Sequence, residues 1–262
     1  MAVAASRDGG RIYVADPDAM CVHRFDLGRN RYRCLVPRSG EGVAAPVGLA
    51  ITDDSQIFVT DSLRGLLWQV PPDGKYLEPF YVSETLDQPT GVFWDEGAQI
   101  LYVIDTAGQA VLQFDRLGNL KRKIGERGSG PGQFNYPTYA WLDPNRHLLV
   151  TDSLNFRLQR FDADGTHIKT FGVGGDRPGD FARPKGVATD SMGHVYVVDA
   201  LLHAIQIFDA DGRLLLAIGE HGQGKGQFWL PNGIFIGQDN TIYVADAYNR
   251  RVQVFRYIGP TT

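Results

Sequence analysis

The sequence has little of what disulfide-rich, zinc-binding or membrane-spanning proteins require. Its 262 residues include only two cysteines, Cys21 and Cys34, which are too few for a disulfide framework or a zinc site. If they lie on adjacent strands of one hairpin, either a disulfide or two half-buried thiols is possible, and we favour the thiols. No apolar run reaches the roughly 18 residues of a transmembrane helix. The opening MAVAASRDGG also lacks the basic and apolar regions of a signal peptide.

Signatures of catalysis are missing as well. The sequence contains no GxSxG, HExxH or Cys/His pattern, which are the arrangements that mark nucleophilic and zinc catalysis. Its six histidines show no metal-ligand spacing. The net charge is −4 at pH 7 and the sequence pI is about 5.8, whereas nucleic-acid-binding domains usually carry a basic stripe and a high pI. We therefore predict no metal, no cofactor and no nucleic-acid partner.

What the sequence does contain is a repeat. A short apolar run that ends in aspartate, such as IYVAD or LLVTD, recurs six times. The six aspartates are Asp16, Asp61, Asp105, Asp152, Asp199 and Asp246. Nine residues after each aspartate stands a further core candidate: Phe25, Val70, Phe114, Phe161, Phe208 and Phe255. A proline precedes the strand before the run in five repeats: Pro46, Pro89, Pro137, Pro184 and Pro231.

Each repeat reads as four short strands joined by turns, and no helical period competes with this pattern. Four-stranded units of about 40 to 50 residues are typical of propeller blades, which bury their faces by stacking around an axis. The sequence therefore predicts an all-β fold, a six-bladed β-propeller of four-stranded antiparallel blades in a single domain. The approximate blades are 1–45, 46–88, 89–136, 137–183, 184–230 and 231–262.

Two recurring features have structural explanations. An aspartate that is present in every blade serves every blade, whereas a catalytic pair needs distinct environments. We expect these carboxylates to accept backbone N–H groups of the loops that follow them. The glycine-rich segments GERGSGPGQF and GEHGQGKGQF suggest phosphate loops, but such loops join a strand to a helix. We interpret them as linkers between blades.

The repeats resemble a known family. The segment GQFWLPNGIFIGQDNTIYVADAYNRRVQVF (226–255) is similar to a strong NHL repeat, as are residues 132–165 and the fifth repeat. The resemblance covers the whole chain and implies the fold, but not one function. NHL propellers serve as protein-binding, RNA-binding or sensor domains, and a related set are amidating lyases with metal-binding histidines around the axis. The similarity to bacterial NHL proteins, which are often exported, implies a periplasmic or secreted location.

Two sets of residues are candidates for binding. Loops between the second and third strands of each blade open on one face, and a loop tip is normally polar, so repeated apolar tips indicate an interaction surface. The candidates on this top face are Leu63, Leu154, Phe156, Arg157, Leu201, His203, Tyr248 and Arg250. The residues that follow the prolines should stand at the rim of the central channel: Val47, Thr90, Thr138, Tyr139, Lys185 and Asn232. We expect Trp94 and Trp141 nearby to fill gaps between blades.

These observations favour a monomeric, non-catalytic scaffold that binds a protein or peptide partner through the top face and channel rim. A small-molecule ligand is also possible. One alternative is a metal-assisted lactonase- or lyase-type enzyme with its site in the channel. A second alternative is an RNA-binding NHL domain, for which four basic residues would form the patch: Arg157, Lys185, Arg250 and Arg251.

The two ends of the chain determine how many strands we expect in blade 6. Met1 aligns with the proline position of the other repeats, so we expect the chain to start at the innermost strand of blade 1. The third strand of blade 6 runs to about Tyr257, and the few residues after it suit a strand poorly because they contain Gly259 and Pro260. We therefore expect blade 6 to have three strands here, with the fourth supplied from upstream of Met1 in a longer protein.

Overall fold

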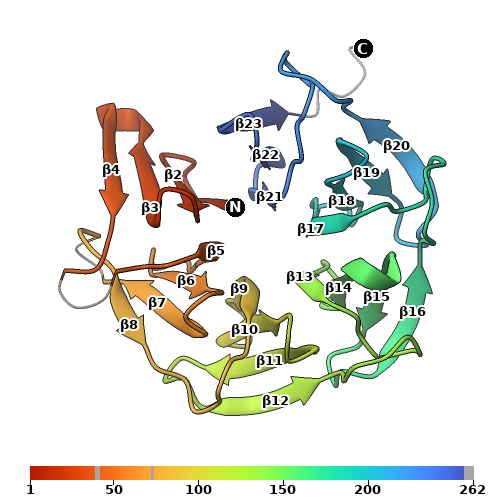
Figure 1. The fold of residues 1–262 in the computed structure, drawn as a ribbon, viewed down its shortest axis with the longest axis horizontal. Helices are drawn as coiled ribbons and strands as arrows, with labels where there is room; N and C mark the ends of the chain where they lie inside the picture. Colours follow the sequence, from red (N-terminus) through yellow and green to blue (C-terminus); the bar gives the residue numbers. More distant parts are fainter. Residues whose placement is uncertain (39–41, 72–73, 257–262) are drawn as a thin grey trace.

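A computed structural model describes residues 1–38, 42–71 and 74–256 of the chain. Six antiparallel sheets surround a central axis like the blades of a propeller (Figure 1). Within the described residues, blades 1 to 5 have four strands each and blade 6 has three. In every blade the strands follow one another in chain order from the axis to the periphery. The predicted all-β, six-bladed propeller is thus confirmed.

The first strand of each blade lies next to the axis. These innermost strands are β1 (Ala2–Ala5), β5 (Pro46–Ile51), β9 (Pro89–Asp95), β13 (Pro137–Leu142), β17 (Pro184–Thr189) and β21 (Ile234–Ile236). The second strands are β2 (Arg11–Asp16), β6 (Ile57–Asp61), β10 (Ile100–Asp105), β14 (Leu148–Asp152), β18 (Val195–Asp199) and β22 (Thr241–Asp246). Each of the six recurring aspartates is therefore the last residue of a second strand.

The third and fourth strands complete the blades. The third strands are β3 (Cys21–Asp26), β7 (Leu66–Val70), β11 (Ala110–Asp115), β15 (Arg157–Phe161), β19 (Ala204–Phe208) and β23 (Arg251–Arg256). The outermost strands are β4 (Arg31–Leu35), β8 (Glu78–Phe80), β12 (Leu120–Ile124), β16 (His167–Phe171) and β20 (Leu214–Ile218).

Among the described residues, helical structure is confined to two single turns of 3-10 helix, η1 (Leu27–Arg29) and η2 (Ser153–Asn155). In the part of the chain that the structure describes, no helix has the length and hydrophobicity needed to cross a membrane.

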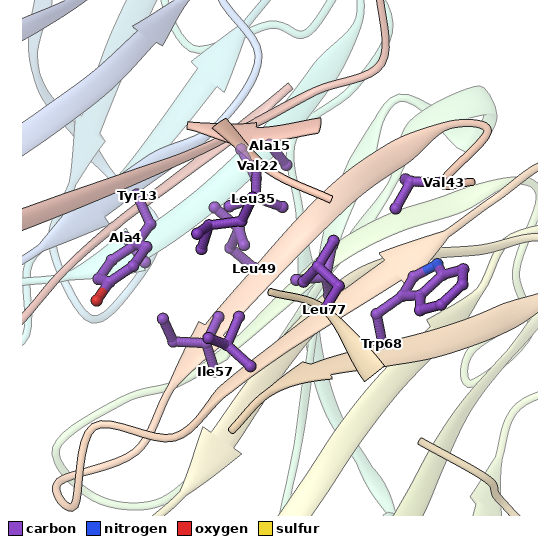
Figure 2. Packing of buried hydrophobic residues seen from close by; sticks show 13 residues of the cluster. Ala4, Tyr13, Ala15, Val22, Leu35, Val43, Leu49, Ile57, Trp68 and Leu77 are labelled. Carbon is purple, nitrogen blue, oxygen red and sulfur yellow. The ribbon is translucent and has the colours of Figure 1, made fainter. Parts of the chain in front are cut away.

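The second strands explain why the apolar runs are continuous rather than alternating. Successive side chains of a strand point to opposite faces of the sheet. In β6, Ile57 and Val59 pack toward blade 1, whereas Phe58 between them packs toward blade 3. Both faces of the sheet are thus buried against neighbouring blades, so an apolar residue is needed at every position. Figure 2 shows the cluster between blades 1 and 2.

The ring closes through contacts between the innermost strands. Each innermost strand contacts the next one, and β1 also contacts β21 and β22 of blade 6. Gly233 of blade 6 makes this approach possible, since a Cβ built there would lie 2.9 Å from the Cα of Ala2. The two ends of the propeller are therefore joined by backbone packing near the axis.

The two cysteines are joined, contrary to our preference for free thiols. Cys21 is the first residue of β3 and Cys34 lies diagonally across from it on β4, where His23 is the direct partner of Cys34. Their Cα atoms are 5.8 Å apart and the structure contains the disulfide. The register of β3 and β4 places the two cysteines at a Cα separation within the usual range for a disulfide, which favours the bond over free thiols.

The outer side of blade 6 is open in the described structure. Among residues 1–38, 42–71 and 74–256, no strand pairs with β23 on the side away from β22. A cleft of about 810 Å³ lies between β23 and blade 1. Phe25 lines this cleft and is 37% exposed, although its counterpart Phe161 is buried. The question of a fourth strand after β23 falls on residues 257–262, which lie outside the described residues.

Candidate functional site

The top face is formed by the loops between second and third strands and by the linkers that enter each innermost strand. Ser62, Thr106, Ser153 and Ala200 each donate a backbone hydrogen bond to the linker in front of their own blade. The apolar loop tips project from this face. Exposed fractions are 77% for Leu63, 38% for Leu154, 52% for Leu201 and 62% for Tyr248. Their role in binding a partner stays a prediction.

A row of rings crosses the boundary between blades 5 and 6 on this face. The ring centroids of His203 and His221 are 4.6 Å apart, those of His221 and Trp229 are 5.7 Å apart, and those of Trp229 and Tyr248 are 5.6 Å apart. The backbone N–H of Tyr248 donates to the carbonyl of Trp229 at 3.1 Å. We call these four residues the aromatic row. Our sequence analysis missed His221 and Trp229, because they lie in a linker that pairs with the loop only in the folded ring.

The fourth residue after each recurring aspartate has a left-handed backbone. These residues, with φ between 50° and 63°, are Met20, Gly65, Gln109, Phe156, His203 and Arg250. Blade 2 requires glycine here, because a Cβ at Gly65 would lie 2.5 Å from the carbonyl oxygen of Leu86. Residues other than glycine are uncommon in this conformation. Three of our candidate binding residues therefore share one strained loop position.

At this position, His203 connects blade 5 to blade 6. Its Nδ1 accepts the backbone N–H of Leu230 at 3.1 Å, and the equivalent Gln109 accepts the N–H of Tyr136 at 2.8 Å. Burial, and secondly the neighbouring His221, lower the pKa of His203 below its ordinary value. The accepting nitrogen must be unprotonated, so the ring carries its proton on Nε2. His203 thus links blade 5 to blade 6 and is less free for a partner than we predicted.

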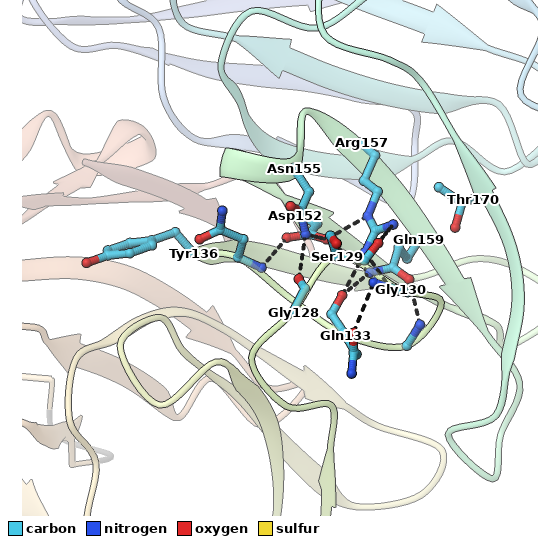
Figure 3. Close-up of polar contacts among 12 residues, drawn as sticks. Gly128, Ser129, Gly130, Gln133, Tyr136, Asp152, Asn155, Arg157, Gln159 and Thr170 are labelled. Atoms are coloured by element: carbon cyan, nitrogen blue, oxygen red, sulfur yellow. Dashed lines mark hydrogen bonds and ion pairs between the residues drawn. The ribbon is translucent and has the colours of Figure 1, made fainter.

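The recurring aspartates accept hydrogen bonds, as predicted, but not only from the loops that follow them: Asp152, which has the most complete network (Figure 3), also binds the linker that precedes its blade. One carboxylate oxygen accepts the backbone N–H of Asn135 at 2.7 Å. The other accepts side-chain N–H groups of Asn155, Arg157 and Gln159 at 2.8, 2.7 and 3.1 Å. Asp152 is fully buried. A buried charge is tolerated when it is paired and hydrogen-bonded in this way.

Arg157 connects Asp152 to the linker that precedes blade 4 in the chain. Its guanidinium donates to the carbonyls of Ser129, Gly130 and Gln133 at 2.8 to 2.9 Å, and only 12% of the side chain is exposed. Arg157 is therefore bonded mainly within the protein, and its role as a top-face binding residue stays a prediction. The guanidinium has five donors in a fixed fork, and the linker carbonyls and Asp152 use them.

Blade 6 repeats the same network. Asp246 accepts the backbone N–H of Trp229 and side-chain bonds from Asn249, Arg251 and Gln253. Arg251 donates to linker carbonyls at 2.6 to 2.8 Å. The sequence signal was the spacing Asn-x-Arg-x-Gln, which begins three residues after the aspartate in repeats four and six only. We call this arrangement the arginine latch.

The arginine latches use two of the basic residues that an RNA-binding patch on the top face would need. Of the four basic residues proposed for it, Arg157 and Arg251 bind linker carbonyls. Lys185 is half-buried, and burial followed by the charge of Arg183 lowers its pKa to about 8. Only Arg250 remains exposed. Nucleic-acid affinity rests on many simultaneous phosphate contacts, so the top face is poorly suited to them.

Asp61, Asp105 and Asp199 hold the linkers by accepting linker backbone N–H groups. Asp61 accepts the N–H groups of Ala44 and Ala45 at 2.8 and 3.0 Å. Asp105 and Asp199 make the equivalent pairs of bonds. Asp199 also accepts N–H groups from the loop that follows it. In every blade, the recurring aspartate thus accepts backbone N–H groups, which is a structural role.

The predicted channel rim is largely occupied by bonds within the protein. The Thr90 hydroxyl lies 2.6 Å from that of Thr106 and 3.0 Å from the carbonyl oxygen of Thr138. Thr138 is only 7% exposed, and its hydroxyl lies within hydrogen-bond distance of those of Thr151 and Ser153. Thr138 is therefore buried rather than exposed at the rim, and its contact with a ligand stays a prediction. Val47 is half-buried on β5.

Tyr139 crosses the channel instead of lining it. Its hydroxyl donates to Oδ1 of Asn232 in blade 6 and lies equally close, at 3.3 Å, to the carbonyl of Met1 in blade 1. Burial raises the pKa of this phenol above its ordinary value. Repeat four has tyrosine where four of the other repeats have glycine, so its side chain fills the space at the axis. Asn232 is therefore occupied by Tyr139.

A second aromatic layer lies toward the opposite face. Trp141 and Phe235, on β13 and β21, meet edge-to-face with centroids 6.1 Å apart. The equivalent residue of blade 5 between them is Ala188, which pairs with Tyr196 as Trp141 pairs with Leu149. Its small side chain leaves room for Trp141 to reach blade 6. Trp141 therefore fills a gap between blades, as predicted.

The two rings lie in the wall of a cup at the mouth of the channel on the opposite face. The cup has a volume of about 420 Å³ and is lined from blades 1, 2, 3, 4 and 6, with Trp94 on one side. Its rim is polar: Arg7 pairs with Asp53 at 3.0 Å. Glu96 accepts the indole N–H of Trp94 at 2.8 Å. Cavities of this size that are mostly apolar with a few polar groups are typical of small-molecule sites.

Metal ligands do not gather in the described part of the chain: it contains no group of three or more histidine, cysteine, aspartate or glutamate side chains placed to hold an ion. The metal-assisted enzyme stays an alternative.

Comparison with known proteins agrees with this architecture. The DUF5128 family model, which describes a six-bladed β-propeller, matches residues 93–174 and 185–257, more than half of the chain. The chain belongs to this family. The more specific NHL assignment stays a prediction. Among curated proteins, none matches the sequence of this DUF5128 propeller.

Solved structures share the fold at low sequence identity. Virginiamycin B lyase from Staphylococcus aureus is 15% identical with a TM-score of 0.68, and the match covers 98% of this chain and 83% of the lyase. An auxiliary nutrient binding protein from Bacteroides thetaiotaomicron is 12% identical with a TM-score of 0.75, covering 98% and 68%. A protein of unknown function from the same organism is 15% identical with a TM-score of 0.72, covering 97% and 68%. One is a lyase and another a binding protein, so this likeness establishes the fold alone.

Proposed function

We propose that this DUF5128 propeller is a non-catalytic binding module whose top face engages an apolar segment of a protein or peptide. The aromatic row carries the proposal, because it places rings from two blades and a linker side by side on the surface. Tyrosine and tryptophan are enriched at the energetic centres of protein interfaces. Leu201 and Leu154, both exposed, extend the apolar surface toward blade 4.

The fold supports this use of the surface. The arginine latches and the His203–Leu230 bond hold the loops and linkers of blades 4 to 6 against the ring. Contact residues on a rigid support lose less conformational entropy when they bind. The proposal therefore needs no rearrangement of the propeller.

Selection of peptides from a random display library tests the proposal. We expect the wild-type protein to select sequences with aromatic or aliphatic residues. The double variant Leu201→Ser/Tyr248→Ser should bind them at least about 30-fold more weakly, since a buried interface anchor contributes about 2 kcal/mol. The free energy of unfolding of the variant should change by less than about 0.5 kcal/mol per substitution, because both side chains are on the surface.

Leu117→Ser provides the matched control. Leu117 is 82% exposed in the turn between β11 and β12, away from the aromatic row. Its substitution should leave peptide binding unchanged. The proposal fails if the library yields no peptide, or if selected peptides bind the double variant as well as the wild type.

A small-molecule site in the cup is a second candidate, supported by the enclosed aromatic wall. Asp8, Asp53, Glu96 and Asp239 outnumber Arg7 among the charged lining residues, so a cationic ligand is favoured. We expect phenethylamine to quench tryptophan fluorescence and its neutral analogue phenethyl alcohol to bind more weakly. Glu96→Gln should weaken amine binding and Glu126→Gln, in a top-face linker, should not. Equal binding of the amine and the alcohol would contradict this candidate.

A further inference from the structure

Two arginines occupy the same place in blades 1 and 4. Arg24 on β3 and Arg160 on β15 each stand eight residues after a recurring aspartate. Each donates to a backbone carbonyl in the outer turn of the next blade, Arg24 to Gly74 and Arg160 to Ala210, both at 2.7 Å. The position thus has one structural role in both blades. The two arginines differ in the charges that surround them.

The surroundings of Arg160 contain carboxylates. Asp143 Oδ2, at the first position after β13, lies 3.6 Å from Arg160 Nε. Lys169 is the direct cross-strand neighbour of Arg160, and its ammonium lies 3.7 Å from Asp211. Arg160 and Lys169 therefore each have an acidic neighbour.

The surroundings of Arg24 contain further cations. Ser6 takes the place of Asp143, since both follow an innermost strand and donate their backbone N–H across the turn. The direct cross-strand neighbour of Arg24 is Arg33. Like charges directly opposite each other on paired strands are destabilising. Blade 1 nevertheless keeps both arginines next to each other.

A small cleft collects these charges on the outer rim of blades 1 and 2. Its volume is about 140 Å³, and Arg24, Arg29, Arg31, Arg33 and Lys75 line it, with Asp26 as the one carboxylate among its lining residues. Within the described part of the chain, no hydrogen bond or ion pair joins the side chains of Arg29, Arg31 or Arg33 to another residue. This concentration of positive charge stands out in a chain whose net charge is −4.

The geometry points to a binding site for an oxyanion, the phosphate or sulfate group of a soluble small molecule, in this basic cleft. Guanidinium groups bind such anions through paired N–H donors. Arg24 is held in place by the Gly74 carbonyl, so it offers a fixed donor at the inner end of the cleft. A bound dianion would relieve the repulsion between Arg24 and Arg33. The site lies on the rim, apart from the top face.

Titration calorimetry and thermal unfolding at constant ionic strength, with chloride as the balancing ion, test this assignment. Inorganic phosphate, sulfate and glucose 6-phosphate are the probes, and their order of affinity distinguishes phosphate groups from sulfate groups. We expect saturable one-to-one binding and a rise in Tm. Arg33→Gln should weaken binding about tenfold, which corresponds to about 1.4 kcal/mol, and should not lower the Tm in chloride.

Lys169→Gln is the matched control, because it removes the equivalent cation of blade 4. It should leave anion binding unchanged. The assignment is overturned if no probe binds saturably, if Arg33→Gln binds like the wild type, or if Lys169→Gln weakens binding equally. Binding of duplex DNA alone, with steep salt dependence and no effect of the small anions, would also overturn it.

Discussion

Blades 4 and 1 surround the recurring aspartate of the repeat with different partners. In blade 4, buried Asp152 binds its own loop, Arg157 and the linker ahead of it. In blade 1, half-buried Asp16 accepts bonds from Asp18, Ala19 and His23, all within the same blade. Blade 1 has the Cys21–Cys34 disulfide in its outer hairpin instead. A blade can thus be held to the ring by a buried charge network or stiffened internally by a covalent bond.

The largest predicted effect comes from removing the central charge of a latch. Asp152→Asn should lower the free energy of unfolding by about 3 to 5 kcal/mol, because it leaves the buried Arg157 without its counter-ion and turns an amide N–H toward other donors. Asp16→Asn should cost less than about 1 kcal/mol, since its bonds come from partly exposed groups. Chemical denaturation measures both values. Equal losses in the two variants would show that Asp152 and Asp16 contribute equally to stability, contrary to this prediction.

Loss of the disulfide should have the next largest effect. The double variant Cys21→Ser/Cys34→Ser should lose about 2 to 3 kcal/mol, the amount expected for a short closed loop. Its effect should add to that of Asp152→Asn within about 0.5 kcal/mol, because the two sites share no partner. Denaturation of the single, double and combined variants checks this. Strong non-additivity would show that blade 1 and blade 4 are coupled through the ring.

The two arginine latches allow a finer comparison. The side chain of Arg157 is 12% exposed and that of Arg251 is 31% exposed. Since solvent screens the more exposed pair, Arg157→Gln should cost about 2 kcal/mol and Arg251→Gln about 1 kcal/mol. Urea unfolding of the two variants gives the ranking. The reverse order would mean that blade 6 depends on its latch more than its exposure indicates.

The smallest predicted effect is a pH dependence at the bond between blades 5 and 6. The lowered pKa of His203 means that the unfolded chain binds its proton more readily, so stability falls as pH drops from about 6.5 through the folded-state pKa. His203→Gln should remove part of this acid loss, because glutamine, as at Gln109, accepts the N–H without titrating. We expect the wild type to lose more stability than His203→Gln between pH 7 and pH 5. Unfolding curves at both pH values measure it.

Repetition made the fold predictable. Six aspartates in one register fixed the number of blades, the second strands and the structural role of the carboxylates. The Asn-x-Arg-x-Gln spacing was also visible in the sequence and would have predicted that Arg157 is bonded within the protein. Other features depend on residues that meet only across the ring. The aromatic row joins two blades, Tyr139 reaches across the axis, and the basic cleft combines β4 with the outer turn of blade 2.

Tyr139 and Trp141 have a consequence for communication through the molecule. Both rings come from one strand, β13, and both reach blade 6 at the axis. The two side chains therefore connect blade 4 to blade 6 at two positions along β13. In the proposed function, a ligand in the cup and a partner on the top face would lie on opposite sides of these two side chains, and β13 would be the element that connects the two sites.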